Sequence, residues 1–395
     1  MDDRIVYKKS AFEELKFDLQ SKYYNKKVFI FTSKSLTNSH LTEIMSAVSM
    51  AGCDFKYFVA KHNFSLQELR SLSEMLSQEV FDLYICFGAG KACDVTKYFA
   101  NIFCIPYLVC PSACSNISYF TNICVNPYDS TRSFVCDSAE KIYIQENVIK
   151  TTPKFLVKQG VYFVMSLSQL LCDSQIEHIL LDGDDNFKTI EGDISKLKKE
   201  LVYIMRGEDE GKLILMDILI SLAEHLKNIN VFNLSMFNLF FIMQKIFMQS
   251  GQNVGGGETF ILSAQMILLS YKNLFSQKKI KQLEIPDFPK IAKNIKKYAI
   301  FYKKIHNFAF FEAILAQKDI LIRLNNLKEE FLYQTQKRLE DIQDMLKVVK
   351  KYENVFSFSL PKLKDMFTSF SVLPYVCENS YIVSLMGGIG ICNVM

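Results

Sequence analysis

Short apolar runs alternate with amphipathic stretches along the first third of the chain. Most of the runs have apolar residues on both faces, so they predict strands whose two faces are both buried. Alternation of such strands with helices indicates a parallel sheet covered by helices on both sides. The predicted strands are Lys27–Thr32, Phe55–Ala60, Phe81–Phe87, Ile105–Cys110 and Lys141–Ile144, and the predicted helices are Leu41–Ala51, Ser65–Glu79 and Ala92–Phe103.

The pattern changes after Ile144, and helical periodicity continues from Glu146 onward. The clearest helices are Leu213–Lys227, Asn233–Gln249 and Leu324–Tyr352, with breaks at Gly183–Asn186 and around Pro286 and Pro289. We therefore predict an α/β protein with two domains. Residues 1–147 form a Rossmann-like, dinucleotide-binding parallel-sheet domain, and residues 148–395 form an all-helical domain.

Composition narrows the class of protein. Hydrophobic residues make up 49% and charged residues 22% of the chain, which is typical of a folded globular protein. The formal net charge of +4 is too balanced to indicate nucleic acid by itself. The basic stretch Lys293–Lys304 is interpreted as a solvated helix face, with a patch for nucleic acid or another anionic surface as the alternative. Eleven cysteines without a CxxC pair indicate buried thiols in a reducing compartment.

We expect a cytoplasmic protein without a membrane partner. The N-terminus lacks the apolar segment of a signal peptide. The most apolar stretch, Val231–Met248, is interrupted by Asn, Gln and Lys residues, which predicts a core helix. The sequence leaves the oligomeric state open.

The strongest local motif is Gly88-Ala89-Gly90-Lys91, which lies between a predicted strand and a predicted helix. Glycines let a backbone approach a pyrophosphate closely, and a helix N-terminus attracts anions. Cys93 stands where the dinucleotide fingerprint has its third glycine, so a tight turn that closes a βα unit is the alternative.

Small hydroxyl residues follow the next predicted strand, in the segment Pro111–Ser115. The carboxyl end of a strand is where ligands bind in open α/β sheets. Ser112 and Ser115 are therefore candidate ligand contacts, with a helix cap or turn as the alternative interpretation.

Together these segments resemble a known superfamily. FGAGKACDVTKYFA and IPYLVCPSACS, with 16 residues between Asp94 and Pro111, are similar to the glycine loop and the Pro-Thr-x-x-Ser element of the iron-containing alcohol dehydrogenase and dehydroquinate synthase-like superfamily. The nearest branch is sn-glycerol-1-phosphate dehydrogenase. The resemblance continues through Lys141–Ile144 and Pro153–Gly160 and reappears in Gly255–Glu258.

The resemblance implies NAD or NADP as cofactor and a divalent metal that polarises the substrate hydroxyl. It also implies cofactor contacts from the glycine loop and the two serines, with Thr121 near a further contact. The candidate cofactor-binding residues are Gly88, Gly90, Lys91, Ala92, Cys93, Asp94, Ser112, Ser115 and Thr121.

The residues that would hold the family's substrate and metal are replaced. Ile117 stands at the place of an aspartate that holds the substrate, and Phe163 at the place of a metal-binding aspartate. Thr259 and Ser263 stand at the places of two histidines, and no His-Gly element lies between Phe275 and Pro289. We therefore expect no catalytic metal.

Other residues could rebuild a metal site only in part. None of the five histidines is spaced to pair with another as a metal ligand. Asp173 and Glu258 are the acidic residues that could bind Mg²⁺ weakly.

The first predicted strand ends in Thr32-Ser33-Lys34, without the acidic residue that bonds an adenine ribose. A lysine there fits the 2′-phosphate of NADP, and an exposed lysine in a turn is the alternative. Two functions follow from the resemblance. One is an NAD(P)-dependent oxidoreductase that acts on a small polyol phosphate or alcohol, and the other is a catalytically inactive relative that binds a nucleotide or a partner.

Overall fold

The computed structural model of the chain describes residues 2–37, 39–61, 64–128, 133–181, 188–226, 235–249, 254–279 and 318–353. The chain divides into two units. Unit 1 consists of Met1–Gly160 and Tyr203–Lys227, and unit 2 consists of Val161–Val202 and Asn228–Met395. Unit 1 therefore includes helical residues from the second half of the chain. The division into domains of residues 1–147 and 148–395 stays a prediction.

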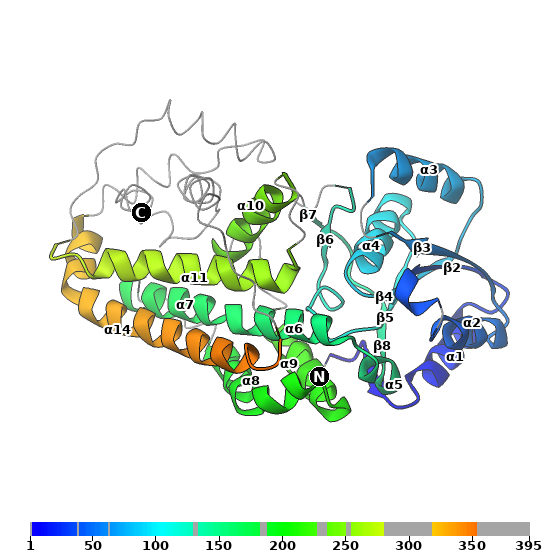
Figure 1. Ribbon diagram of the computed structural model, residues 1–395. Helices are drawn as coiled ribbons and strands as arrows, with labels where there is room; N and C mark the ends of the chain where they lie inside the picture. The colour runs from blue at the N-terminus through cyan, green and yellow to red at the C-terminus, as the bar shows by residue number, and fades with distance from the viewer. Residues whose placement is uncertain are drawn as a thin grey trace. The chain divides into compact units, whose positions relative to one another are not determined.

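Unit 1 contains a six-stranded parallel sheet with the strand order β1-β8-β5-β4-β2-β3 (Figure 1). A short antiparallel pair, β6 and β7, lies outside this sheet. The strands are β1 (Ile5–Lys8), β2 (Lys27–Ser33), β3 (Asp54–Ala60), β4 (Leu83–Gly88), β5 (Tyr107–Pro111), β6 (Ile123–Val125), β7 (Ser133–Val135) and β8 (Lys141–Gln145).

The five strands predicted from apolar runs all form, and the parallel sheet is confirmed. The central strands β4 and β5 are buried at every position, as a strand covered on both faces must be. Strand β1 and the pair β6–β7 are additional to the prediction.

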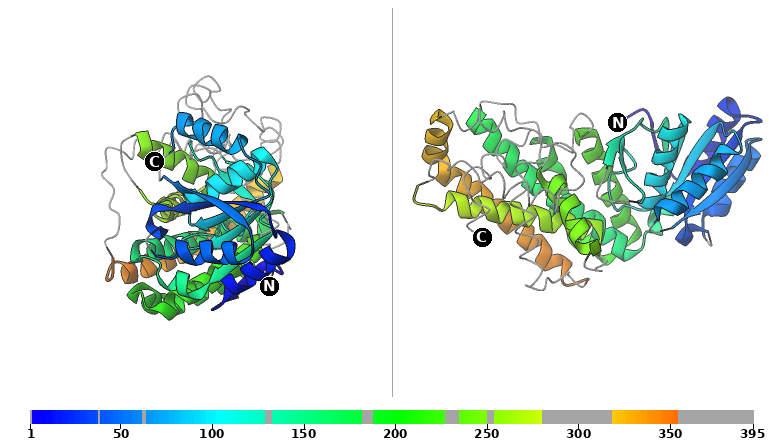
Figure 2. Two further views of the ribbon diagram at one scale, coloured as in Figure 1. Left: turned by 90° about the vertical axis from the view of Figure 1, so that its right-hand side faces the viewer. Right: turned by 90° about the horizontal axis from the view of Figure 1, so that it is seen from above.

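Helices cover the two faces of this sheet (Figure 2). On one face, α1 (Ala11–Lys22) and α2 (Leu41–Met50) bury apolar side chains in a core that also contains residues of β2, β4 and β5. On the other face, α4 (Lys91–Phe103) packs on β4 and β2, and the rings of Phe99 and Phe31 stack at 6.1 Å. The unit also contains η1 (Lys34–Leu36), α3 (Leu66–Ser77) and α5 (Glu146–Lys150).

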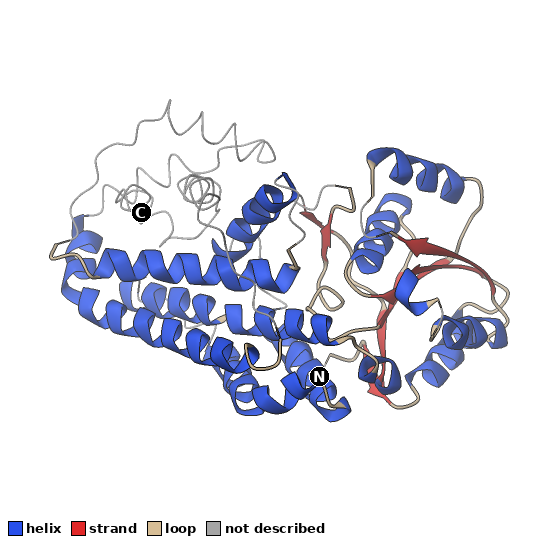
Figure 3. Ribbon diagram, viewed as in Figure 1, coloured by secondary structure: helices blue, strands red, loops and turns tan. Residues whose placement is uncertain are grey.

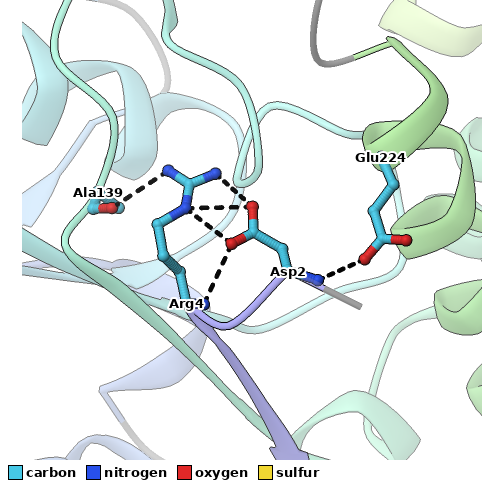
Figure 4. Close-up of polar contacts among 4 residues, drawn as sticks. All are labelled: Asp2, Arg4, Ala139 and Glu224. Atoms are coloured by element: carbon cyan, nitrogen blue, oxygen red, sulfur yellow. Dashed lines mark hydrogen bonds and ion pairs between the residues drawn. The ribbon is translucent and has the colours of Figure 1, made fainter.

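Helix α9 (Asp209–Leu226) belongs to unit 1, although it follows the sheet by more than sixty residues of chain. The backbone N–H of Asp2 donates to Glu224 Oε1 at 2.5 Å, and the Arg4 guanidinium pairs with Asp2 at 2.6 Å (Figure 4). The Lys212 ammonium also donates to the carbonyl oxygen of Lys150 in α5. These contacts tie α9 to the start of β1 and to the end of α5.

The described residues of unit 2 contain helices and no strand (Figure 3). Helix α14 packs against α11 and α7, and α11 also packs against α10. The predicted helices at Asn233–Gln249 and Leu324–Tyr352 are confirmed over their described residues, and the breaks at Gly183–Asn186, Pro286 and Pro289 lie outside them. The helices are α7 (Ser168–Leu181), α10 (Ser235–Gln249), α11 (Gly256–Phe275) and α14 (Lys318–Val349), while α6 (Lys154–Ser166) and α8 (Lys188–Arg206) have residues in both units.

One helical stretch among the described residues, Lys154–Ile176, is long and apolar enough to cross a membrane. Its most apolar window is 78% buried inside the protein, as in a core helix of a folded domain. The observed architecture is the one that the periodicity predicts, a Rossmann-like sheet followed by helices.

Candidate functional site

The glycine loop joins the end of β4 to the start of α4. Gly90 precedes the first helical residue with φ 48° and ψ −106°, a backbone conformation that favours glycine. A Cβ built on Gly90 would meet no atom within 4 Å, whereas a Cβ on Gly88 would lie 2.7 Å from the Cβ of Ala92. Gly88 thus allows the helix to approach the strand, and Gly90 leaves open space at the helix N-terminus.

The two candidate serines lie beside this loop. Strands β4 and β5 are neighbours, with Gly88 in register with Pro111, and the Ser112 N–H donates to the Gly88 carbonyl at 3.2 Å. Ser112 and Ser115 are buried, and the Ser115 hydroxyl lies 3.4 Å from that of Tyr119. The structure therefore brings the glycine loop and the serine segment together at the carboxyl edge of the sheet.

A second feature of the topology marks the same edge. From β2 the chain passes through α2 on one face of the sheet, and from β4 it passes through α4 on the other face. Because β2 and β4 are adjacent, their carboxyl ends form the topological switch point at which open α/β sheets bind ligands. Ser33 ends β2 there, with its backbone nitrogen 3.8 Å from the position of a Cβ on Gly88.

Lys91 lies in the first turn of α4. The positive end of the helix dipole disfavours a cation there unless an anion is also present. A lysine beside the open space at Gly90 is therefore suited to a negatively charged ligand.

Three other candidate residues face the protein interior. Ala92 and Cys93 are buried, so only their backbone could meet a ligand. Asp94 is also buried, and its Oδ1 accepts the Val125 N–H at 3.1 Å. Burial raises the pKa of Asp94 to about 6, although the charges of Lys91 and Lys97 lower it in part.

Thr121 lies on the segment between β5 and β6 and is partly buried. Its hydroxyl is 3.4 Å from the Ser118 carbonyl, and its own carbonyl accepts a hydrogen bond from the Lys97 ammonium at 2.7 Å. The cofactor role of these residues stays a prediction.

The sequence interpretation did not identify Lys97. This lysine of α4 is fully buried, and its ammonium donates to three backbone carbonyl oxygens. The only signal in the sequence is a pair of opposite charges, Asp94 and Lys97, three residues apart in an otherwise mostly apolar helix.

In unit 2, Phe163 stands where the family resemblance implies a metal-binding aspartate, and it lies in an aromatic cluster. Phe163 is 2% exposed, and its ring centroid is 5.2 Å from that of Phe260. Phe260 stacks on Phe240 at 3.9 Å with 7° between the ring planes, and its ring centroid is 5.0 Å from that of Phe237. Aromatic rings are not metal ligands, and this cluster is packed as a core.

Thr259 and Ser263 stand where the family resemblance implies two histidines, and both form hydrogen bonds with other groups. Thr259 accepts a hydrogen bond from Gln244 at 2.5 Å and donates to the Gly255 carbonyl at 3.1 Å. The Ser263 hydroxyl donates to the Thr259 carbonyl at 2.8 Å, within the same helix. These residues do not fit the donor set that a catalytic zinc or iron requires.

The described residues contain no group of three or more His, Cys, Asp or Glu side chains that could hold a metal ion. Both ring nitrogens of His40 have partners, since Nδ1 lies 2.7 Å from Glu43 and Nε2 lies 3.2 Å from Thr151. Asp173 accepts a hydrogen bond from the Tyr271 hydroxyl, and Glu258 accepts the Gly255 N–H at 3.0 Å. His62 and His306 lie outside the described residues.

Comparison with known proteins agrees with the geometry of unit 1. Residues 2–138 match the family described as iron-containing alcohol dehydrogenase. Comparison with the curated proteins found no match.

Solved structures resemble the chain over nearly its whole length. An iron-containing alcohol dehydrogenase from Thermotoga maritima has a TM-score of 0.60 at 12% identity, with 93% of this chain and 90% of that chain covered. A glycerol dehydrogenase from Schizosaccharomyces pombe has a TM-score of 0.57 at 15% identity, with coverage of 90% and 93%. A 1,3-propanediol oxidoreductase has a TM-score of 0.61 at 12% identity, with coverage of 98% and 97%.

At these identities the structural likeness establishes the fold, and the sequence match establishes the kinship of the N-terminal part. We conclude that residues 2–138 belong to the iron-containing alcohol dehydrogenase superfamily and that the chain as a whole has the fold of its solved members.

Proposed function

We propose that this protein is an oxidoreductase of the alcohol and polyol dehydrogenase type that binds NAD or NADP over the glycine loop of unit 1. One observation carries the proposal. Gly90, in a conformation that favours glycine, leaves open space at the N-terminus of α4, next to the switch point between β2 and β4. A dinucleotide pyrophosphate fits such a place because its charge meets a helix N-terminus and a lysine.

The substrate class is inferred from the resemblance. Fold neighbours include a glycerol dehydrogenase and a 1,3-propanediol oxidoreductase, and the glycine-loop segments resemble sn-glycerol-1-phosphate dehydrogenase. A small polyol phosphate or alcohol is therefore the proposed substrate. Lys34 follows the end of β2 and is exposed, as both a contact with the 2′-phosphate of NADP and a solvated lysine in a turn require, so the proposal includes both NAD and NADP.

A second candidate function is a nucleotide-binding relative without metal-dependent turnover. The aromatic cluster of Phe163, Phe260 and Phe240 favours it, because the family's metal would need ligands at Phe163, Thr259 and Ser263. Both candidates share the dinucleotide site, and they differ only in whether hydride transfer takes place.

A fluorescence titration tests the shared site. We expect saturable binding of NADPH or NADH to the wild-type protein and at least about ten-fold weaker binding to Gly90→Ala, because the added methyl group enters the proposed pyrophosphate site. Gly207→Ala is the matched control. Gly207 also has a positive φ, of 77°, so alanine strains the backbone there too, and it lies outside the glycine loop.

Saturable binding that only Gly90→Ala weakens supports the site. Absence of binding of either dinucleotide, or equal loss in both variants, contradicts it. Oxidation of glycerol-1-phosphate and glycerol by NADP or NAD, measured with and without added zinc, then separates the two candidates. Turnover supports the dehydrogenase, and its absence in a protein that binds the dinucleotide supports the inactive relative.

A further inference from the structure

Lys97 is the most deeply buried charged side chain among the described residues of α4. Its exposed fraction is 0%, and its ammonium lies between the helix and the segment that leads from β5 to β6. Burial of an ammonium group is costly unless hydrogen bonds and charges compensate for lost water. A lysine that served only to solubilise the helix would not be found there.

Three backbone carbonyl oxygens compensate for that burial. The Lys97 Nζ atom donates to Ser118 at 2.5 Å, to Thr121 at 2.7 Å and to Ile123 at 2.8 Å. An ammonium has three N–H donors, so these carbonyls use its full capacity. All three belong to one turn of six residues, which is thereby closed around a single charge.

Other side chains of α4 bind the same segment. Asp94 accepts the Val125 N–H, and the Cys93 thiol lies 3.9 Å from the Ser118 carbonyl. In the reverse direction, the Cys124 thiol donates to the Asp94 carbonyl at 3.3 Å. The contacts recur along the first two turns of α4, so the helix and the segment form one connected piece.

This piece carries both halves of the proposed nucleotide site. The N-terminus of α4 bears Gly90 and Lys91, and the segment bears Thr121 within the turn and Ser115 shortly before it. A displacement of the turn would therefore move Thr121 relative to the glycine loop.

We propose that Lys97 is a positioning residue that holds the Ser118–Ile123 turn against α4 and so keeps Thr121 in place for the dinucleotide. The inference rests on the proposed function of the glycine loop. It assigns to a buried lysine the task of fixing the turn that bears Thr121 against the helix that begins at the glycine loop, in addition to the contacts of Cys93 and Asp94. Pre-organisation of this kind lowers the cost of binding.

The test compares Lys97→Met with Lys97→Arg and with a control lysine. Methionine keeps most of the length of the side chain and removes the charge and all three donors. Lys212→Met is the matched control because the Lys212 ammonium also donates to a backbone carbonyl of unit 1, that of Lys150, away from the turn. Each variant is measured by dinucleotide titration, by melting temperature and by hydrogen exchange of peptides that cover residues 118–125.

For Lys97→Met we expect at least about ten-fold weaker binding of the dinucleotide that the wild-type protein prefers. We also expect exchange at residues 118–125 to be faster than in the wild-type protein, by a larger factor than elsewhere in unit 1. Lys97→Arg should recover part of the affinity, and Lys212→Met should bind within about two-fold of wild type even where its melting temperature falls.

Binding by Lys97→Met within about two-fold of wild type overturns the inference, as does unchanged exchange at residues 118–125. If Lys97→Met does not fold, Lys97→Gln is measured in the same way, with the same outcomes. If the wild-type protein binds neither dinucleotide, the proposed function fails, and the exchange measurement alone decides whether Lys97 holds the turn.

Discussion

Replacement of Phe163 by aspartate restores the residue type that the family resemblance implies at this position. If the site retained its metal chemistry, the new carboxylate would gain a ligand role. In the structure, however, the Phe163 side chain is buried against Phe260, and the neighbouring hydroxyls of Thr259 and Ser263 already have partners. We therefore expect Phe163→Asp to destabilise unit 2 and to gain no metal.

The magnitude follows from what the ring contributes. Truncation of a buried phenylalanine to alanine costs about 3–5 kcal/mol, because burial is lost and a cavity remains. The edge-on contact with Phe260, at 5.2 Å and 77°, is included in that cost. An unpaired carboxylate adds a desolvation penalty, so at pH 7 the total should reach about 4 kcal/mol or more.

Phe163→Asn is the matched control, since asparagine has the size of aspartate without its charge. A carboxyl group buried without a cation has a raised pKa in the folded state. The folded protein then binds a proton more tightly than the unfolded chain, so stability falls as pH rises above about 4. The two variants should be equally stable near pH 4, and Phe163→Asp should be the weaker near pH 8.

The assay is urea unfolding of wild type, Phe163→Asp and Phe163→Asn at both pH values, with and without zinc. Zinc should leave the difference between the two variants unchanged. Stability of Phe163→Asp equal to that of wild type would show that this side chain does not fill the core. A rise in stability with zinc for Phe163→Asp alone would show that metal ligands remain nearby, and the assignment of an aromatic core would be wrong.

Three further outcomes follow from the structure. Asp94→Asn should match wild type near pH 4 and be more stable above about pH 6, by on the order of 3 kcal/mol, because burial raises the folded pKa of Asp94 from 3.8 to about 6 and the cost of its charge appears as pH rises. Urea unfolding across this pH range measures the difference, and a more stable wild type at pH 8 would contradict it. Tyr271→Phe removes one hydrogen bond to the buried Asp173 and should lower the free energy of unfolding by about 1–3 kcal/mol, with an unchanged value contradicting the contact. Purified protein should contain less than stoichiometric zinc and iron by elemental analysis, and one metal per chain that is lost on mutation of unit 2 would refute this.

The sheet could be predicted because its central strands carry their own signal. Leu83–Phe87 and Ile105–Cys110 are apolar throughout, and glycine or proline follows each of them. Ile5–Lys8 was missed because four residues among charged neighbours form no such run. Helix α9 was predicted as a helix. An amphipathic pattern shows that one face of a helix is buried, but it does not show which element covers that face. The contacts of α9 with Asp2 and Lys150 are therefore known only from the structure.

For the candidate site, too, part could be predicted from the sequence and part required the structure. The glycine loop is visible in sequence because only glycine adopts the conformation of Gly90 without strain. Phe163 was recognised as a departure because the resemblance fixes its place in the chain. The stacking of Phe240 on Phe260 depends on how α10 packs against α11, and a lysine such as Lys97 is expected to be exposed until tertiary contacts show otherwise.

The central claim is that unit 1 binds a dinucleotide without help from a metal. A calorimetric titration of the full-length protein with NADPH, and separately with NADH, in buffer that contains EDTA tests it most directly. We expect saturable binding of at least one dinucleotide at one site per chain, with an affinity that is unchanged when zinc replaces EDTA. Absence of binding of both dinucleotides, or binding that appears only with zinc, would contradict it.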